Sequence, residues 1–241
     1  MLARDHLPTE LLETLTASID EVEETVRRAA GAAYGHGSDL AVLQFSESAA
    51  DVTGIGRLFV SAQRDAAVAT LEWAETIDRV SPGAGEWVII SDEQWPELGQ
   101  LRVLWKAWFF VVRALCDHVY RLLLAQTESR AALRGGSMGG ALKTPANPVA
   151  IILAEAAPDF LAWFGAYRDR RNVVKEGVAL TCTALHSPGV AITFDEYRID
   201  PTTGRHSRLV DSDRHRVTLA DVQEDVRQLI AVLTIVADRY A

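Results

Sequence analysis

Apolar residues recur at alternating spacings of three and four in two long stretches, one near each end of the chain. This spacing lines one side of an α-helix with apolar side chains and predicts helices that bury that side. The first stretch predicts a helix over about Thr9–Ala33, with Leu12, Leu15, Ile19, Val22, Val26, Ala29 and Ala33 on its buried face. The last stretch predicts a C-terminal helix that buries Leu219, Val222, Val226, Leu229, Leu233, Val236 and Tyr240. We therefore expect a mainly α protein, a helical bundle.

Further helices are predicted between these two. Residues 35–39 break the first helix, and a second is expected over about 46–80, with Val52, Ile55, Leu58, Phe59, Ala62, Leu71, Ala74 and Ile77 buried. Pro96 suits a first helical turn, so a third helix is expected over about 96–127. Asn147 before Pro148 is typical of an N-cap followed by proline at the first helical position, and Pro158 begins another helix.

The residue types change after Gly177. Residues 178–185 and 190–199 are rich in Val, Ile, Thr, Phe and Tyr, and a Ser-Pro-Gly turn at 187–189 separates them. This pattern predicts a small β-hairpin inserted before the C-terminal helix, and residues 207–210 add a third short strand. Thr218 with Asp221 predicts a capping arrangement at the start of the final helix.

The composition restricts the partners that the whole surface can attract. The 241 residues are 49% hydrophobic, enough for a core that needs no disulfide or metal. The net charge of -9 opposes general attraction to phosphate backbones, so contact with a nucleic acid requires a local basic patch. The two cysteines, Cys116 and Cys182, do not suggest a disulfide framework, and Cys116 lies in an apolar run as a core residue would.

The two cysteines favour a reducing cytoplasm, and two segments argue against secretion and against a membrane span. Residues 1–13 contain no apolar run long enough for a signal peptide. The most apolar segment, residues 103–124, is interrupted by charged or titratable side chains, which are Lys106, Arg113, Asp117, His118 and Arg121. These residues are spaced too closely to be hidden in lipid, so the segment is interpreted as a core helix.

A glycine-rich segment, residues 134–145, is interpreted as a flexible connection because glycine and serine confer flexibility. The glycines also suggest a phosphate-binding loop, but the Gly-Lys-Ser/Thr ending is missing and no strand pattern precedes the segment. This connection separates an N-terminal helical region, 1–134, from a second helical region with the β-hairpin, 145–241, unless the two form one continuous domain.

Four cations gather where the helix that begins at Pro158 is predicted to end, and Gly177 is a typical helix terminator there. The cations are Arg168, Arg170, Arg171 and Lys175, with Asn172 among them and Glu176 after them. Cations at a helix C-terminus also interact favourably with the helix dipole, so an ordinary capping role competes with a binding site. The aromatic residues of this helix, Trp163, Phe164 and Tyr167, are interpreted as core or dimer contacts rather than as base-stacking groups.

The end of this helix resembles the second conserved helix of HEPN domains, which carry Arg, a polar residue, three more residues, then His and often Gly. Arg171, Asn172 and Gly177 match this pattern, whereas Glu176 stands in place of the His. The helix, hairpin and long final helix extend the resemblance over roughly residues 145–241. It implies a helical homodimer with a groove at its two-fold axis, and in active family members that groove cleaves RNA without a metal.

The residue types at this site decide which chemistry is expected. The guanidinium of Arg171 can bind a phosphate through two parallel hydrogen bonds. Histidine serves proton transfer in metal-free RNA cleavage because its pKa lies near neutrality, whereas an ionised Glu176 is a poor proton donor and repels phosphate. We expect Arg168, Arg170, Arg171, Asn172 and Lys175 to bind RNA or a nucleotide, with Arg171 and Glu176 as a degenerate catalytic pair.

A second expected function belongs to a different class, a non-enzymatic helical scaffold whose apolar stripes bind a partner protein. The acidic composition favours it. No cofactor is implied by the sequence, and no metal either, because the spacing of His206, Asp211, Asp213 and His215 matches no zinc pattern.

Overall fold

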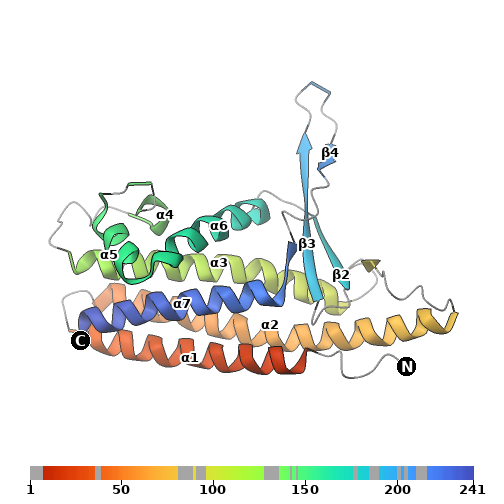
Figure 1. Cartoon of the computed structure of the whole chain (residues 1–241), viewed down its shortest axis with the longest axis horizontal. Helices are drawn as coiled ribbons and strands as arrows, with labels where there is room; N and C mark the ends of the chain where they lie inside the picture. Colours follow the sequence, from red (N-terminus) through yellow and green to blue (C-terminus); the bar gives the residue numbers. More distant parts are fainter. Residues whose placement is uncertain are drawn as a thin grey trace. The chain divides into compact units, whose positions relative to one another are not determined.

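The computed structural model describes most of the chain and contains seven helices and five strands in the described part (Figure 1). The described residues are 8–35, 39–80, 89–90, 96–127, 136–141, 143–144, 146–175, 179–184, 190–199, 202–203, 206–209 and 216–241. The helices are α1 Thr9–Ala33, α2 Asp39–Val80, α3 Pro96–Ala125, α4 Met138–Ala141, α5 Pro148–Ala156, α6 Pro158–Lys175 and α7 Leu219–Tyr240. The strands are β1 Ile89–Ile90, β2 Ala179–Ala184, β3 Val190–Ile199, β4 His206–Leu209 and β5 Arg216–Val217. The mainly α prediction is confirmed.

The chain forms two compact units. The first unit comprises residues 1–15, 58–106 and 170–222, and the second comprises 16–57, 107–169 and 223–241. Each unit contains a segment of α1, α2, α3, α6 and α7, so both draw on residues before and after the glycine-rich segment.

The strands all belong to the first unit. β2 pairs with β3 in antiparallel register, with Cys182 opposite Ile192. β1 continues the sheet beyond β2, while β4 and β5 pair with different parts of β3. The turn expected at 187–189 lies outside the described residues. In the helical part of this unit, the rings of Phe59 on α2 and Trp105 on α3 meet edge to face, with centroids 4.7 Å apart.

The apolar faces predicted for α1 and α7 are buried in the parts of these helices that belong to each unit. All of the residues expected on the α1 and α7 stripes are buried, including Ile19 on α1 and Leu229 on α7. Helix α2 approaches α1 and α3 at a glycine, because a Cβ atom at Gly56 would lie 3.0 Å from Ile19 and 3.4 Å from Trp108. Gly56 therefore marks a close approach of three helices.

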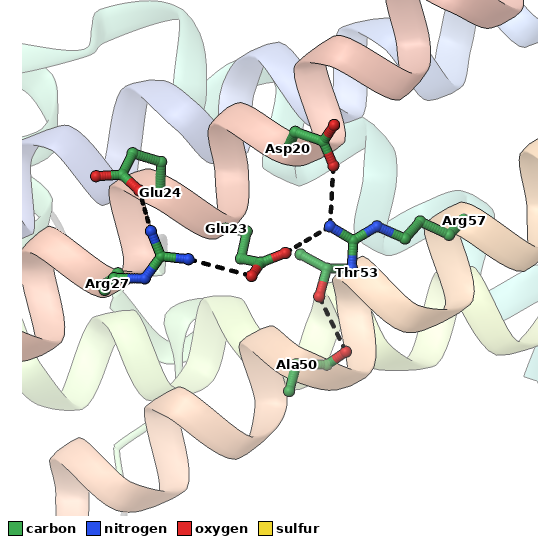
Figure 2. Close-up of polar contacts among 7 residues, drawn as sticks. All are labelled: Asp20, Glu23, Glu24, Arg27, Ala50, Thr53 and Arg57. Carbon is green, nitrogen blue, oxygen red and sulfur yellow. Dashed lines mark hydrogen bonds and ion pairs between the residues drawn. The ribbon is translucent and has the colours of Figure 1, made fainter.

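Ion pairs also join α1 and α2 on the surface of the second unit (Figure 2). Arg57 of α2 donates hydrogen bonds to Asp20 and Glu23 of α1, and Arg27 donates to Glu23 and Glu24 within α1. The Arg57–Asp20 distance is 2.9 Å. Because these side chains are largely exposed, the network adds little to the stability that the buried faces supply.

The predicted start of α2 and part of its predicted buried face were wrong, since Ile55 is half-buried and Leu58 is exposed. The helix begins at Asp39 rather than near residue 46, and the Asp39 carboxylate accepts a hydrogen bond from the backbone N–H of Gly35 across the break. Val42 and Phe45 extend the buried face into the added turns. Leu58 was expected in the core but is 53% exposed, because the buried face of α2 runs through Phe59, about 100° away around the helix.

The glycine-rich segment is not a loose connection where the structure describes it. Residues 138–141 form a short helical turn, α4, whose Met138 is fully buried. The backbone N–H of Met138 donates to Asp117 of α3 over 2.8 Å. A Cβ atom at Gly136 would lie 2.5 Å from the ring of Tyr120, so the absence of a side chain lets this segment lie against α3. The interpretation as a flexible connection was therefore wrong for residues 136–141.

Candidate functional site

Helix α6 positions the basic residues that the sequence singles out, and local signals set its start. Asn147 caps the preceding helix α5 by accepting a hydrogen bond from the Val149 N–H at 2.9 Å, with Pro148 in the first turn. Pro158 then begins α6, as predicted. The backbone of α6 is described to Lys175, whereas the Lys175 side chain and all of Glu176 and Gly177 lie outside the described residues.

The aromatic residues of α6 lie in the core of the second unit. Trp163 is 8% exposed, and Phe164 and Tyr167 are fully buried. The Tyr167 hydroxyl donates to the backbone carbonyl of Trp108 on α3, and its ring packs against Phe109. These side chains are core contacts, so the prediction that they do not form a surface for stacked bases is confirmed for the described structure.

The basic residues of α6 differ in their contacts. Arg168, in the second unit, contacts the carboxylate of its neighbour Asp169 over 3.1 Å, and Asp169 is 70% exposed. Arg171, in the first unit, is half-buried, and its Nη1 donates to the side-chain oxygen of half-buried Asn172 over 3.4 Å. Arg171 and Asn172, which both match the resemblance, therefore contact each other.

Arg170 forms the best-defined ion pair of the site. Its Nη1 lies 2.9 Å from Oδ1 of Asp221 in the first turn of α7, and the two side chains are 21% and 34% exposed. This pair joins the end of α6 to the beginning of α7 within the first unit. The sequence predicts that Arg170 is available to a ligand, and no local pattern indicates its carboxylate partner.

Asp221 has a second role, because it also caps α7. Its Oδ2 accepts hydrogen bonds from the backbone N–H and the hydroxyl of Thr218, each over 2.8 Å. The Asp221 N–H donates in return to the Thr218 hydroxyl at 3.4 Å. This reciprocal arrangement is a capping box, and the prediction of a cap at these two residues is confirmed.

These contacts define what the site can do chemically. Arg170, Arg171 and Asn172 supply guanidinium and amide N–H groups, which donate hydrogen bonds to phosphate or carboxylate oxygens. Asp221 supplies a carboxylate 2.9 Å from Arg170. Among the described residues, no group of three His, Cys, Asp or Glu side chains is placed to hold a metal ion.

A second polar cluster lies in the second unit, outside the basic end of α6. Arg113 pairs with Asp117 over 3.0 Å, and its guanidinium lies over the ring of Phe164 at 4.7 Å from the centroid. Asp117 is therefore occupied by Arg113 and by the Met138 N–H. The neighbouring His118 is half-buried, and burial lowers its pKa, with a further contribution from Arg121.

Within the part of the chain that the structure describes, no single helix has the length and apolar character to cross a membrane. Helices α5 and α6 satisfy that test only when taken together, and they are bent by 115° at the break between them.

Comparisons of this chain with models of protein families, with curated proteins and with solved structures found no match.

Proposed function

We propose that this protein is a HEPN-like module that binds RNA or a nucleotide through the basic end of α6. Its support is the pairing of Arg171 with Asn172, two half-buried residues that follow one another where the resemblance requires them. A buried helix face anchors them, because Tyr167 and Val174 on either side of them are buried. The planar guanidinium loses less freedom for each hydrogen bond that it forms with a phosphate than a flexible ammonium does.

The proposed module continues through the β-hairpin to α7 and acts as a cytoplasmic homodimer. In the family that it resembles, the groove at the two-fold axis contains the Arg of both copies. A dimer of this chain would place two copies of Arg171 in such a groove, so a single substitution removes two cations from it.

Ribonuclease activity is proposed to be reduced or absent. Cleavage through the 2'-hydroxyl of RNA requires a group that gives a proton to the leaving oxygen, and Glu176 stands where the family has a histidine. An ionised carboxylate can accept a proton but cannot donate one at neutral pH. The proposed function is therefore binding, with catalysis absent or weakened.

Binding and cleavage of a labelled single-stranded RNA by the purified protein test this proposal. The wild type is expected to bind, and Arg171→Ala is expected to bind more weakly. Arg227→Ala serves as the matched control, because Arg227 is an exposed arginine on α7 that pairs with Glu224. Equal affinity of the wild type and Arg171→Ala would contradict the proposal. The variant Glu176→His, which restores the histidine of the family that the chain resembles, is expected to gain cleavage.

A second candidate function, a protein-binding scaffold, rests on an apolar surface near the turn between α1 and α2. Tyr34, Leu40 and Leu43 are 65%, 70% and 61% exposed, and the two leucines are three residues apart on one face of α2. A stable protein partner that co-purifies without nucleic acid, and no longer does so with Leu40→Ser/Leu43→Ser, would favour this function over RNA binding.

A further inference from the structure

Arg170 and Asp221 form a contact that bears directly on the proposed RNA site. Both side chains are only partly exposed, 21% and 34%, and their oppositely charged groups are 2.9 Å apart. A guanidinium nitrogen that donates to Asp221 cannot donate the same hydrogen to a phosphate. The neighbouring carboxylate also repels an approaching phosphate.

We propose that Asp221 is an internal competitor that occupies Arg170 and thereby weakens RNA binding at the end of α6. This inference rests on the proposed function, since it concerns the regulation of that same site. An RNA phosphate can use all the donors of Arg170 only when Arg170 has left Asp221. The observed affinity is therefore the affinity of the open form multiplied by the fraction of molecules in which the ion pair is open.

Because Asp221 has two carboxylate oxygens, Arg170 can leave it for an RNA phosphate while Asp221 still caps α7. Oδ1 faces Arg170, whereas Oδ2 accepts the hydrogen bonds from Thr218. Release of Arg170 therefore leaves the capping box of α7 intact. Because the ion pair is partly exposed, water and salt reach it, and its opening has a modest cost.

The variant Asp221→Asn separates the two roles of this residue. Its amide oxygen keeps an acceptor for Thr218, while the charge that holds Arg170 is removed. Because the capping acceptor is kept and the lost ion pair is partly exposed, the thermal midpoint of unfolding is expected to remain close to that of the wild type.

The experiment measures the affinity of a labelled single-stranded RNA for full-length variants over a series of salt concentrations. Asp221→Asn is expected to bind about two- to fivefold more tightly, the factor by which a partly exposed ion pair reduces the availability of its arginine. The slope of log affinity against log salt is expected to steepen by about 0.7, the increment for one additional phosphate of a single strand that the protein neutralises.

Two matched variants distinguish this mechanism from a general change of charge. Glu224→Gln removes one negative charge from α7 and leaves the Arg170–Asp221 pair in place, so it is expected to change affinity less. In an Arg170→Ala background, Asp221→Asn is expected to raise the affinity by less than in the wild-type background, because only the repulsion by the carboxylate is lost and the arginine that Asp221 engages is absent.

The outcomes separate this inference from the proposed function. Binding by the wild type that weakens in Arg171→Ala, together with equal affinities of Asp221→Asn and Glu224→Gln, would overturn the competition and leave the function standing. An equal increase in affinity in the Arg170→Ala background would overturn it as well. Binding by Asp221→Asn but not by the wild type would support strong competition. The absence of RNA binding by every variant would overturn both proposals.

Discussion

The indole Nε1 of Trp163 on α6 donates a hydrogen bond to Oδ1 of Asp225 on α7 over 2.8 Å. Trp108 on α3 donates to the other carboxylate oxygen over 3.0 Å, and Asp225 itself is 1% exposed. One buried carboxylate therefore joins three helices of the second unit. A misplaced helix would leave one of these groups buried without its partner, which penalises other packings of α3, α6 and α7.

Replacing Asp225 with alanine is expected to lower the free energy of unfolding by about 2–4 kcal/mol, because two buried indole N–H groups are deprived of these acceptors. Urea denaturation measures the change. Asp238→Ala on the exposed side of the same helix is the control, with an expected change within about 0.5 kcal/mol. Equal effects of the two substitutions would show that the hydrogen bonds of Asp225 to the indoles do not contribute to stability.

Asp225 also illustrates what the sequence could not predict. The stripe that contains Val222, Val226 and Leu229 predicts α7 from local spacing alone, and each of these residues is buried. Asp225 lies beside them, but it is acidic, so a pattern built from apolar residues does not predict that it is buried. Its partners are 117 and 62 residues away in the sequence, and only the packed helices bring them together.

The same division between local and distant signals applies to the candidate site. Thr218 and Asp221 are three residues apart, and their cap was predicted from that spacing. The contact between Asp221 and Arg170 spans 51 residues, and no local pattern indicates it. The start of α2 was misplaced because Asp39 was assigned to the break, whereas α2 begins at Asp39 and its buried face includes Val42 and Phe45.

Gly136 provides a test of how the glycine-rich segment packs on α3. The variant Gly136→Ala would place a Cβ atom 2.5 Å from the ring of Tyr120, which is buried and accepts a hydrogen bond from Asn147. A decrease of about 1–3 kcal/mol in the free energy of unfolding is expected from this overpacking.

The control for Gly136→Ala is Gly165→Ala in α6, where nothing lies within 4 Å of the added atom. This second variant is expected to stabilise the protein by about 0.5–1 kcal/mol, since alanine favours the helix over glycine. If the free energy of unfolding of Gly136→Ala equalled that of the wild type, residue 136 would not be closely packed on Tyr120.

The surface ion pairs between α1 and α2 are expected to contribute little. Hydrogen bonds to Asp20 and Glu23 raise the pKa of Arg57, but the Arg57 side chain is 50% exposed. Arg57→Ala is therefore expected to cost no more than about 1 kcal/mol, and less at high salt because ions screen exposed charges. Chemical denaturation at low and high salt measures both effects. A larger destabilisation that persists at high salt would indicate a role for Arg57 beyond these ion pairs.

His118 is expected to make stability depend on pH near neutrality. Burial lowers its pKa in the folded protein, with a smaller contribution from Arg121, while Asp117 and Glu47 act in the opposite direction. The unfolded state therefore binds the proton first as the pH falls through about 6.5, and the folded state becomes less stable in that range.

A comparison of the wild type with His118→Asn isolates this effect. Between about pH 7.5 and about pH 5.5, the stability of the wild type is expected to fall more than that of the variant, because asparagine does not titrate. The free energy of unfolding from urea titrations at each pH provides the measurement. Parallel pH profiles for the two proteins would contradict the assigned direction of the pKa shift.

The dependence of RNA affinity on salt, measured for the wild type, Arg171→Ala and Arg227→Ala, tests most directly whether the basic end of α6 binds phosphate. The wild type and Arg227→Ala are expected to share one slope of log affinity against log salt. Arg171→Ala is expected to have a slope shallower by about 0.7 for each phosphate that it no longer neutralises. Superimposable plots for all three proteins would contradict the proposed RNA site.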